Sequence, residues 1–445
     1  MGTVPVYRGS FGPAQAERLL WRAGFGPRPG EAKRLAKLGL DGAVHSLTHP
    51  KPERLTGPRP RDDKGRALAP ADAWGHDHLW WLDRMIRTNR PLVERMTLVW
   101  HDWVATSNDG VGSQRLMLAQ NRLLRRHALG SFEELVRDIS ANPAMLLWLS
   151  GTDNTKWSPN ENYARELMEL FTLGEGRGYG ERDVREQARA LTGWRNDWRR
   201  SAGPTNFRFD RERHDRGTKT IFGRRGAFDW RDAVSLCLHH KAHPTFVVEK
   251  LWSYFVPVPP SGATRRALER RYVDSGFEVR PLLDAILRHP ALHTGPRMVK
   301  PPVVYNAGLL RGLGRGIDTT AWTWLAELAG QRLFYPPNVA GWEDDRWLDT
   351  ATFRGRWYVA NQALAAYTAS EKKGHTVPND PEAIVAGALK LLGSPTVRPA
   401  TRRALTAFAR TSLKHANGWK ANAYPPLVAN AVRQLLAVSP DLMTC

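Results

Sequence analysis

A chain of 445 residues that is 42% hydrophobic can bury a large core and form more than one domain. Its 65 basic and 44 acidic residues leave a formal net charge of +21, which points to anionic partners, although an arginine-rich composition also accompanies a GC-rich genome. The two cysteines, Cys237 and Cys445, are too few for a disulfide framework or a thiolate zinc site, so any metal would be held by His, Asp and Glu.

The apolar residues recur at helical spacing along nearly the whole chain, and strand-like alternation is scarce, so the sequence predicts an all-α, multi-helix globular bundle. Ser131 before Glu133 and Glu134 is typical of a helix start, as are Pro29 and Pro91 at a first turn. The helices are expected at 13–22, 29–38, 72–88, 91–106, 113–128, 131–140, 159–173, 181–193, 229–241, 243–256, 263–275, 280–289, 299–313, 319–329, 351–369, 379–392, 398–413 and 422–437.

Three loops interrupt this pattern: the proline-rich segments 50–71 and 257–262, and the polar segment 371–381. The last of them precedes about three further helices. We therefore expect a main helical domain over residues 10–370 and a C-terminal helical subdomain over residues 371–445.

No stretch of 18 apolar residues is present, so no transmembrane segment is expected. The N-terminus lacks the apolar region of a signal peptide, which predicts a cytoplasmic protein for the sequence as written. No recognisable nucleic-acid-binding module accompanies the positive charge. Nucleic acid is therefore not the expected partner, although the charge alone permits it.

The predicted helix 159–173 has a charged side and an apolar side. At about 100° per residue, the charged side carries Glu161, Arg165, Glu166 and Glu169. If this side lines a cavity, it can perform acid/base or metal chemistry, and Arg165 lies in a buried ionic network. If it faces water, the segment is an ordinary amphipathic helix.

Residues 195–226 form the one long segment without a helical pattern, and they hold ten basic and four acidic residues. Their alternating aromatic residues favour a hairpin-like excursion with a turn at Gly217. Because neighbours in an extended segment point to opposite faces, His214 and Asp215 could share a metal only across such a turn. His214 would then transfer protons and Lys219 bind an anionic group. In the alternative, Asp215 caps the turn, His214 bonds a backbone carbonyl and Lys219 is solvated.

The chain is rich in tryptophan, with 18 residues, and most are expected to anchor helix packing, for example Trp100 and Trp252. Trp194 and Trp342 are the candidates for a different role, as aromatic platforms for a sugar or another flat ligand.

A series of motifs runs in unbroken order along residues 15 to 360. They are RLLWRAGFGP at 18–27, WH at 100–101, HALGSF at 127–132, PAML at 143–146, PNENYARELMELFTLG at 159–174, ALTGW at 190–194, HDRGTK at 214–219 and PPNVAGW at 336–342. In these motifs the chain resembles a large bacterial family known as domain-of-unknown-function family 1800. Trp103 stands where the family pattern has a second histidine after His101, so a two-histidine ligand pair is not expected there.

The resemblance implies an architecture without an assigned reaction. Members of this family are often encoded beside a sulfatase-like family, which implies a shared pathway or a complex with such a protein. Related chains are also often exported, so a start codon assigned too far downstream would change the predicted compartment.

We expect a basic, aromatic-lined site where helices 159–173 and 181–194 meet the loop 207–223, with His214 and Lys219 approaching the glutamates. The hypothesis is a hydrolase- or lyase-type enzyme for an anionic small molecule or polysaccharide, a carbohydrate or a phosphoester. The catalytic candidates are Glu161, Glu166, His214 and Asp215. The substrate-binding candidates are Arg165, Arg189, Trp194, Lys219 and Trp342. The candidate ligands of a divalent metal are His101, Glu169, His214 and Asp215.

The alternative hypothesis is a non-catalytic scaffold that binds an acidic or sulfatase-like partner protein. A deep pocket that collects Glu166, His214 and Lys219 would favour the enzyme. A solvent-facing helix between Glu161 and Glu169 would favour the scaffold.

Overall fold

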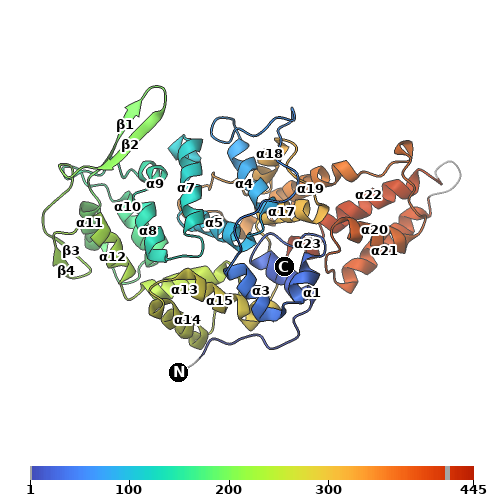
Figure 1. Ribbon diagram of the computed structural model, residues 1–445, viewed down its shortest axis with the longest axis horizontal. Coiled ribbons are helices and arrows are strands. Elements are labelled where there is room, and N and C mark those ends of the chain that lie inside the picture. Colours follow the sequence, from blue (N-terminus) through green and yellow to red (C-terminus); the bar gives the residue numbers. More distant parts are fainter. Residues whose placement is uncertain (1–2, 416–420) are drawn as a thin grey trace. The chain divides into compact units, whose positions relative to one another are not determined.

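The computed structural model describes residues 3–415 and 421–445, and Figure 1 shows that they are mostly helical. The predicted helical character is confirmed. The all-α description needs a correction, because the described residues also form four short strands arranged as two antiparallel hairpins in the segment expected to be hairpin-like. In the described part, no helix is both long enough and apolar enough to cross a membrane.

The packing divides the chain into two compact units, each made of separate stretches of sequence. The first unit contains residues 3–6, 96–289 and 334–342, and the second contains residues 7–95, 290–333 and 343–445, apart from 416–420. The C-terminal helices after residue 371 lie in the second unit. All the candidate site residues lie in the first unit.

The first unit begins at Met96 within α5 (Pro91–Trp103) and continues through helices and two hairpins. Its further elements are α6 (Asn108–Val111), α7 (Gln114–Arg126), α8 (Phe132–Ser140), α9 (Pro143–Trp148), α10 (Asn162–Glu166), a π-helix (Leu167–Thr172), α11 (Glu181–Ala190), β1 (Trp194–Arg199), β2 (Gly203–Phe209), β3 (Lys219–Ile221), β4 (Arg224–Gly226), α12 (Trp230–Leu238), α13 (His243–Ser253), α14 (Gly262–Asp274) and α15 (Val279–Arg288).

Aromatic side chains form the centre of this unit. Trp100 and Trp103 are fully buried, and their ring centroids lie 5.4 Å apart, with Phe132 within 5.7 Å of Trp100. Each buried indole removes about 150–250 Å² from water, worth roughly 4–6 kcal/mol of transfer free energy. The Trp103 indole donates its N–H to the carbonyl of Phe171, so it is also satisfied as a hydrogen-bond donor. These tryptophans are packing anchors, as the sequence predicted.

The segment predicted as one helix over 159–173 is divided, because α10 continues into the π-helix. Three successive carbonyls near the end of the π-helix are capped by side chains from α5 and α13. Leu170 accepts from the Lys250 ammonium at 2.9 Å, Phe171 accepts from Trp103 at 3.0 Å and Thr172 accepts from His243 Nδ1 at 2.9 Å. These donors satisfy carbonyls that a helix end leaves without partners.

The two hairpins differ in size. Strands β1 and β2 pair from Trp194 with Phe209 to Arg199 with Gly203, with an irregularity between Arg195 and Asp197. Strands β3 and β4 pair over three residues each and are joined by a tight two-residue turn at Phe222 and Gly223. Figure 1 shows the β1–β2 hairpin projecting from the helices of its unit.

The second unit is helical. It comprises α1 (Pro13–Arg22), α2 (Glu31–Ala36), α3 (Gly39–Thr48), α4 (His76–Arg87), the first residues of α5, α16 (Pro290–Thr294), α17 (Pro302–Leu313), α18 (Ala321–Leu328), α19 (Thr350–Leu364), α20 (Pro381–Leu391), α21 (Pro399–Leu413), α22 (Tyr424–Ala437) and α23 (Pro440–Met443), with short 3-10 turns at Asp344–Arg346, Ala365–Tyr367 and Glu371–Lys373.

Buried arginines that bind backbone carbonyls hold this unit together. Arg22 donates to the carbonyls of Pro296 and Cys445, and Arg311 donates to the carbonyl of Gly26. A side chain at Gly308 would lie 2.2 Å from the Trp21 ring, so glycine is required where α17 meets α1. The motif at 18–27 is therefore a packing motif.

Lys250 provides a test of the capped π-helix. Burial lowers the pKa of its ammonium to about 8, against an opposing effect of Asp102. In the unfolded chain a lysine has a pKa of about 10.4. Between about pH 8 and pH 10 the unfolded state therefore binds more protons, and the free energy of unfolding should rise with pH. We expect Lys250→Met to reduce this rise in urea denaturation followed by circular dichroism, and the buried Lys300, whose pKa is lowered to about 7, accounts for a part that remains.

The exposed Lys241 gives the matched control, since Lys241→Met should leave the pH dependence unchanged. The same slope in the Lys250→Met variant and in the wild-type protein would contradict a buried, perturbed ammonium.

Candidate functional site

Arg165 is the centre of an ionic network on the charged side of α10 and the π-helix. Its guanidinium contacts Glu161 at 3.1 Å, Glu169 at 3.2 Å and Glu181 at 2.8 Å. The exposed fractions of these side chains are 33% for Arg165, 37% for Glu161, 22% for Glu169 and 65% for Glu181. The network is thus half exposed, and it neither fills a closed cavity nor lies fully in water.

Glu181 is the member that the sequence did not indicate. It is the first residue of α11, and its bidentate contact with Arg165 fastens this helix start to α10. A helix wheel places residues of one helix only, so no periodic signal could have identified a partner from the next helix.

Glu166 is on the same helix but outside this network. Its carboxyl makes no hydrogen bond or ion pair with any described residue. Burial raises the pKa of Glu166, and the neighbouring Glu169 raises it further, while Arg165 opposes both. The nearby Tyr179 hydroxyl is buried, and burial raises its pKa to about 12. This helix therefore carries one carboxyl whose pKa is raised above its usual value.

The excursion after residue 210 is fastened to one side of α11, through polar residues spaced by three. Asp183 accepts from the Phe222 amide at 2.7 Å, and Glu186 accepts from the Thr220 amide at 2.8 Å. Arg189 binds the Asp215 carboxylate at 2.7 Å and the Thr218 carbonyl at 3.2 Å. Residues spaced by three lie along one face of a helix, so this face supplies a ladder of partners for a non-helical backbone.

His214 is nearly buried at the base of this excursion. Its Nδ1 lies 3.0 Å from the Thr192 carbonyl, which can only accept, so Nδ1 carries the proton and Nε2 is left with a lone pair. Nε2 forms no hydrogen bond with a described residue. Burial lowers the pKa of His214, contrary to the rise that a neighbouring carboxylate would cause. The imidazole is neutral near pH 7 and can act as a base.

Asp215 and Lys219 both serve the turn. The Asp215 carboxylate accepts from the Gly217 amide at 2.8 Å, and the Lys219 ammonium donates to the carbonyls of Asp215 and Phe228. Lys219 is fully buried, which differs from the solvated side chain of the structural alternative. The other two features of that alternative, the capped turn and the histidine bound to a carbonyl, are observed.

The two candidate tryptophans pack against other aromatic rings. Trp194 lies 5.7 Å from Phe209 and 5.4 Å from Trp230, measured between ring centroids. Trp342 is 91% buried and packs edge-on against His101 at 5.4 Å. Its amide donates to Asp102, so the motif at 336–342 docks on α5.

The glutamates and the His214 turn have no direct bond to each other in the described part of the chain. No hydrogen bond or ion pair among the described residues joins Glu161, Glu166 or Glu169 to His214 or Lys219. The buried Asn154, which the sequence did not indicate, links their surroundings. Its side chain bonds the Asn160 amide before α10 and the Ala188 carbonyl on α11, and its own carbonyl accepts from Gly193.

A model of the protein family described as "Protein of unknown function (DUF1800)" matches residues 18–444, nearly the whole chain. The chain belongs to this family. No curated protein and no solved structure gives a significant match.

The metal candidates of this DUF1800 protein do not converge. Burial lowers the pKa of His101 to about 3. Its ring packs against the rings of Phe334 and Trp342. The described residues contain no group of three or more His, Cys, Asp and Glu side chains that could hold a metal ion.

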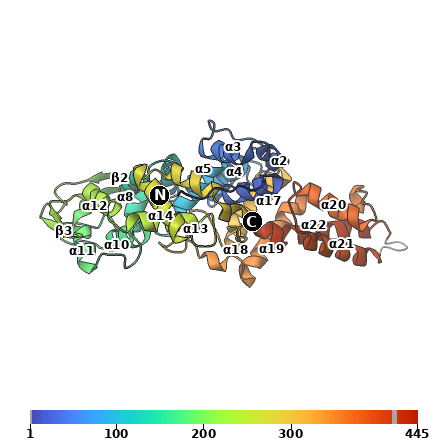
Figure 2. The same cartoon turned by 90° about the horizontal axis from the view of Figure 1, so that it is seen from below.

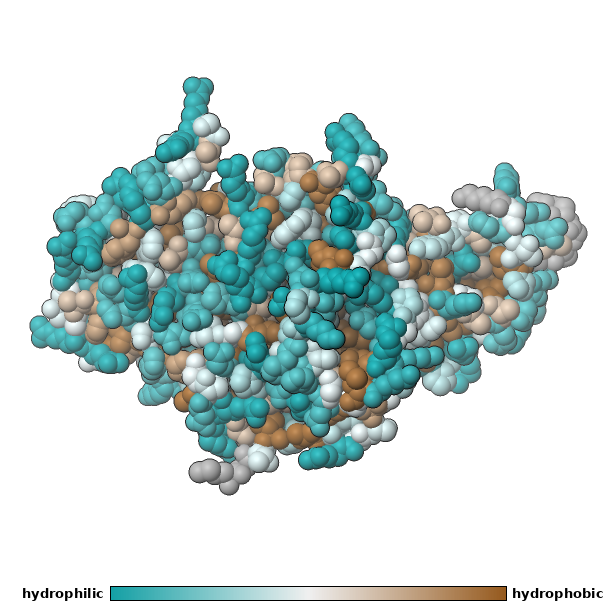
Figure 3. Space-filling model, in the orientation of Figure 1, coloured by the Kyte–Doolittle hydropathy of each residue, from teal (hydrophilic) through white to brown (hydrophobic). Residues whose placement is uncertain are grey.

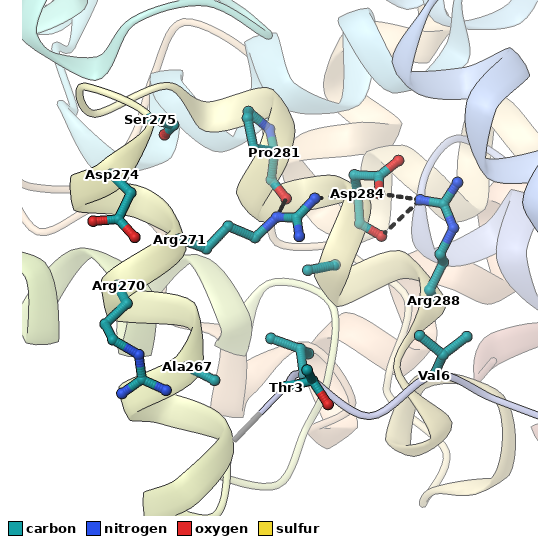
Figure 4. Close-up of a pocket in the computed structure, with 12 residues that line it drawn as sticks. Thr3, Val6, Ala267, Arg270, Arg271, Asp274, Ser275, Pro281, Asp284 and Arg288 are labelled. Carbon is teal, nitrogen blue, oxygen red and sulfur yellow. Dashed lines mark hydrogen bonds and ion pairs between the residues drawn. The ribbon is translucent and has the colours of Figure 1, made fainter. Parts of the chain in front are cut away.

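The surface of the first unit has two hollows that are relevant here. One, of 560 Å³, is lined by α14, α15 and the N-terminal residues Thr3, Val4 and Val6. Figure 4 shows that Arg271 reaches the Pro281 carbonyl and Arg288 reaches Asp284, so these two cations have partners within the hollow. The other, of 480 Å³, lies between the β3–β4 turn and the end of α12.

We expect Arg165→Ala to lower the free energy of unfolding by about 1–2 kcal/mol. Exposed ion pairs contribute about 0.2–1 kcal/mol each, and Arg165 makes three of them, while the loss from a buried network would be about 3–5 kcal/mol. Urea denaturation at low and high salt measures the difference, which should shrink in salt.

Arg137 is the matched control, because among the described residues it forms one ion pair, with Glu133, and its alanine variant should lose less. A loss from Arg165→Ala as large as that of a buried network, or one that is unchanged by salt, would contradict the half-exposed geometry.

Proposed function

We propose that this protein is a hydrolase- or lyase-type enzyme in which Glu166 is the general acid and His214 the general base. The observation that carries this proposal is the Glu166 carboxyl. Glu161 and Glu169 are ion-paired with Arg165, whereas Glu166 has a raised pKa and forms no ion pair or hydrogen bond with a described residue. A carboxyl that keeps its proton can give it to a leaving group.

His214 supports the same proposal from the opposite direction. The Thr192 carbonyl fixes its tautomer and leaves Nε2 unprotonated, and burial lowers the pKa of the ring. A raised carboxyl pKa and a lowered imidazole pKa bring the two groups toward a common working range, which is the pattern of acid/base pairs in enzymes. Asp215 and Lys219 are positioning residues here, because they shape the turn that presents His214.

The substrate is an anionic carbohydrate or phosphoester. The net charge of +21 attracts anions. Arg165 and Arg189 are paired with carboxylates but half exposed, so an anionic substrate would exchange with a carboxylate at one of these guanidinium groups.

The chemistry is tested with four chromogenic substrates, namely 4-nitrophenyl phosphate, bis(4-nitrophenyl) phosphate, 4-nitrophenyl sulfate and 4-nitrophenyl glucuronide. We expect turnover of one class with a bell-shaped pH profile and an optimum below pH 7. The rate falls in acid because His214 becomes protonated and falls in alkali because Glu166 ionises. Glu166→Gln should lower kcat by about 100-fold or more.

Glu161→Gln is the matched control and should retain most of the activity, since that carboxylate is committed to Arg165. No turnover of any of the four substrates, or similar kcat values for Glu166→Gln and the wild-type protein, would contradict the proposed chemistry.

A non-catalytic scaffold is the second candidate, and the β1–β2 hairpin favours it. Trp198 at its tip is 73% exposed, and the adjacent Arg199 and Arg200 are exposed without an ion pair among the described residues. Figure 3 shows the projecting hairpin as mostly hydrophilic. An exposed tryptophan beside two free guanidinium groups is suited to an acidic protein partner, such as a sulfatase-like one.

If the hairpin binds an acidic protein, Trp198→Ala should weaken capture of a purified sulfatase-like partner by about tenfold or more, measured by biolayer interferometry. Trp157→Ala removes another highly exposed tryptophan and should have little effect. Equal binding by the wild-type protein and both variants would exclude the hairpin as the contact surface.

A further inference from the structure

The hollow between the β3–β4 turn and the end of α12 gathers two cations, Arg224 and Lys241, and two histidines. Arg224, Lys241, His239 and His240 line it, together with Gly178, Phe222 and Gly223. Neither Arg224 nor Lys241 makes an ion pair with a described residue. Figures 1 and 2 both place β3, α11 and α12 at the same end of the first unit.

Asp183 is the one acidic side chain that lines this hollow, and its oxygens are directed at the backbone. One accepts from the Gly180 amide at 3.0 Å and the other from the Phe222 amide at 2.7 Å. The carboxylate thus holds the turn and offsets one of the two cations, Arg224 and Lys241, so the hollow keeps an excess of positive charge.

The turn that forms one wall is strained. Phe222 has φ +50° and is followed by Gly223 with φ +76°, so both central residues of the two-residue hairpin loop are left-handed. A phenylalanine rarely adopts this conformation. Its ring lies 4.8 Å from that of His240, and a side chain at Gly178 would approach His240 to 3.2 Å, so the turn is packed closely against the end of α12.

The strand register determines which arginine enters the hollow. Ile221 pairs with Arg224 and is fully buried, while Thr220 pairs with Arg225. Directly paired residues lie on one face of a hairpin, so Arg224 shares the inner face with Ile221 and Arg225 lies on the opposite face. Only Arg224 lines the hollow.

His239 adds a hydrogen-bond acceptor. Its Nδ1 donates to the Ser235 carbonyl at 2.9 Å, so in the neutral ring Nε2 carries a lone pair. Such a nitrogen accepts from the P–OH group of a hydrogen phosphate, whereas a sulfate has no proton to donate.

We propose that this hollow is a binding site for the phosphate group of a small molecule. Arg224 supplies a planar guanidinium fork and Lys241 a point charge for the phosphate oxygens, and His239 accepts from the hydroxyl of the singly protonated phosphate group. The volume of 480 Å³ lies in the range of about 300–1,000 Å³ for small-molecule sites and leaves room for an organic body beside the phosphate group. The site is distinct from Glu166 and His214, and it does not depend on the proposed chemistry.

The test is isothermal titration of the full-length protein with inorganic phosphate and with sulfate at constant ionic strength. We expect saturable binding of phosphate that is tighter than that of sulfate. Arg224→Ser should weaken phosphate binding by about tenfold or more, which is the loss of one charged hydrogen-bonding group. His239→Leu should remove the preference for phosphate over sulfate.

Arg225→Ser is the matched control, because it removes the same charge from the adjacent, outward-facing residue and should change the affinity by less than about twofold. Melting followed by circular dichroism checks that each variant is folded. Equal losses from the two arginine variants would reveal a diffuse field and overturn the site, as would the absence of saturation. Equal affinity for sulfate and phosphate would overturn the phosphate assignment. No result depends on turnover, so this proposal and the proposed enzymatic function fail independently.

Discussion

The fold of the first unit depends on how a non-helical backbone finds hydrogen-bond partners within a helical domain. Helices satisfy their own amides and carbonyls, but the segment after residue 210 cannot. The polar face of α11 supplies what it lacks: Asp183 and Glu186 accept amides, Arg189 binds a carbonyl and a carboxylate, and Thr192 accepts the Asp215 amide at 2.8 Å. Without this face, the turn that presents His214 would lose its support.

The same constraint acts at the π-helix, where side chains from other elements cap three carbonyls. In both places the partners come from residues far apart in sequence. The amphipathic pattern predicted helices over most of the chain and a hairpin-like excursion at the right segment, because these features depend on neighbours three or four residues apart or on strand alternation. It could not predict that Lys250 would meet Leu170, because nothing in the periodicity of either helix encodes their contact.

For the candidate site, too, the sequence predicted contacts within one helix and missed contacts between elements. The sequence correctly grouped Glu161, Arg165 and Glu169, since they are spaced by four on one helix. It gave no sign of Glu181 or Asn154, which join this helix to the next through contacts between elements. It also treated Arg189 and Lys219 as free cations, although one is bound to carboxylates and the other is buried against carbonyls. A count of charges indicates the field around a protein but not which charges are already neutralised.

The charged groups that are not neutralised by a neighbour are therefore the ones that matter for binding and catalysis. Near the α11 ladder, carboxylates and carbonyls engage Arg165, Arg189 and Lys219. Glu166 departs from the pattern as an acid without a cation, and Arg224 and Lys241 depart from it as cations without an acid. Holding like charges at one hollow raises the free energy of the unliganded protein, and an anion that binds there relieves this repulsion. Asp183 supplies part of that relief, because its carboxylate lines the same hollow, but it offsets only one of the two cations. The hydrogen bonds to the Gly180 and Phe222 amides hold this carboxylate in the wall of the hollow, and the remaining positive charge is what an anion would neutralise.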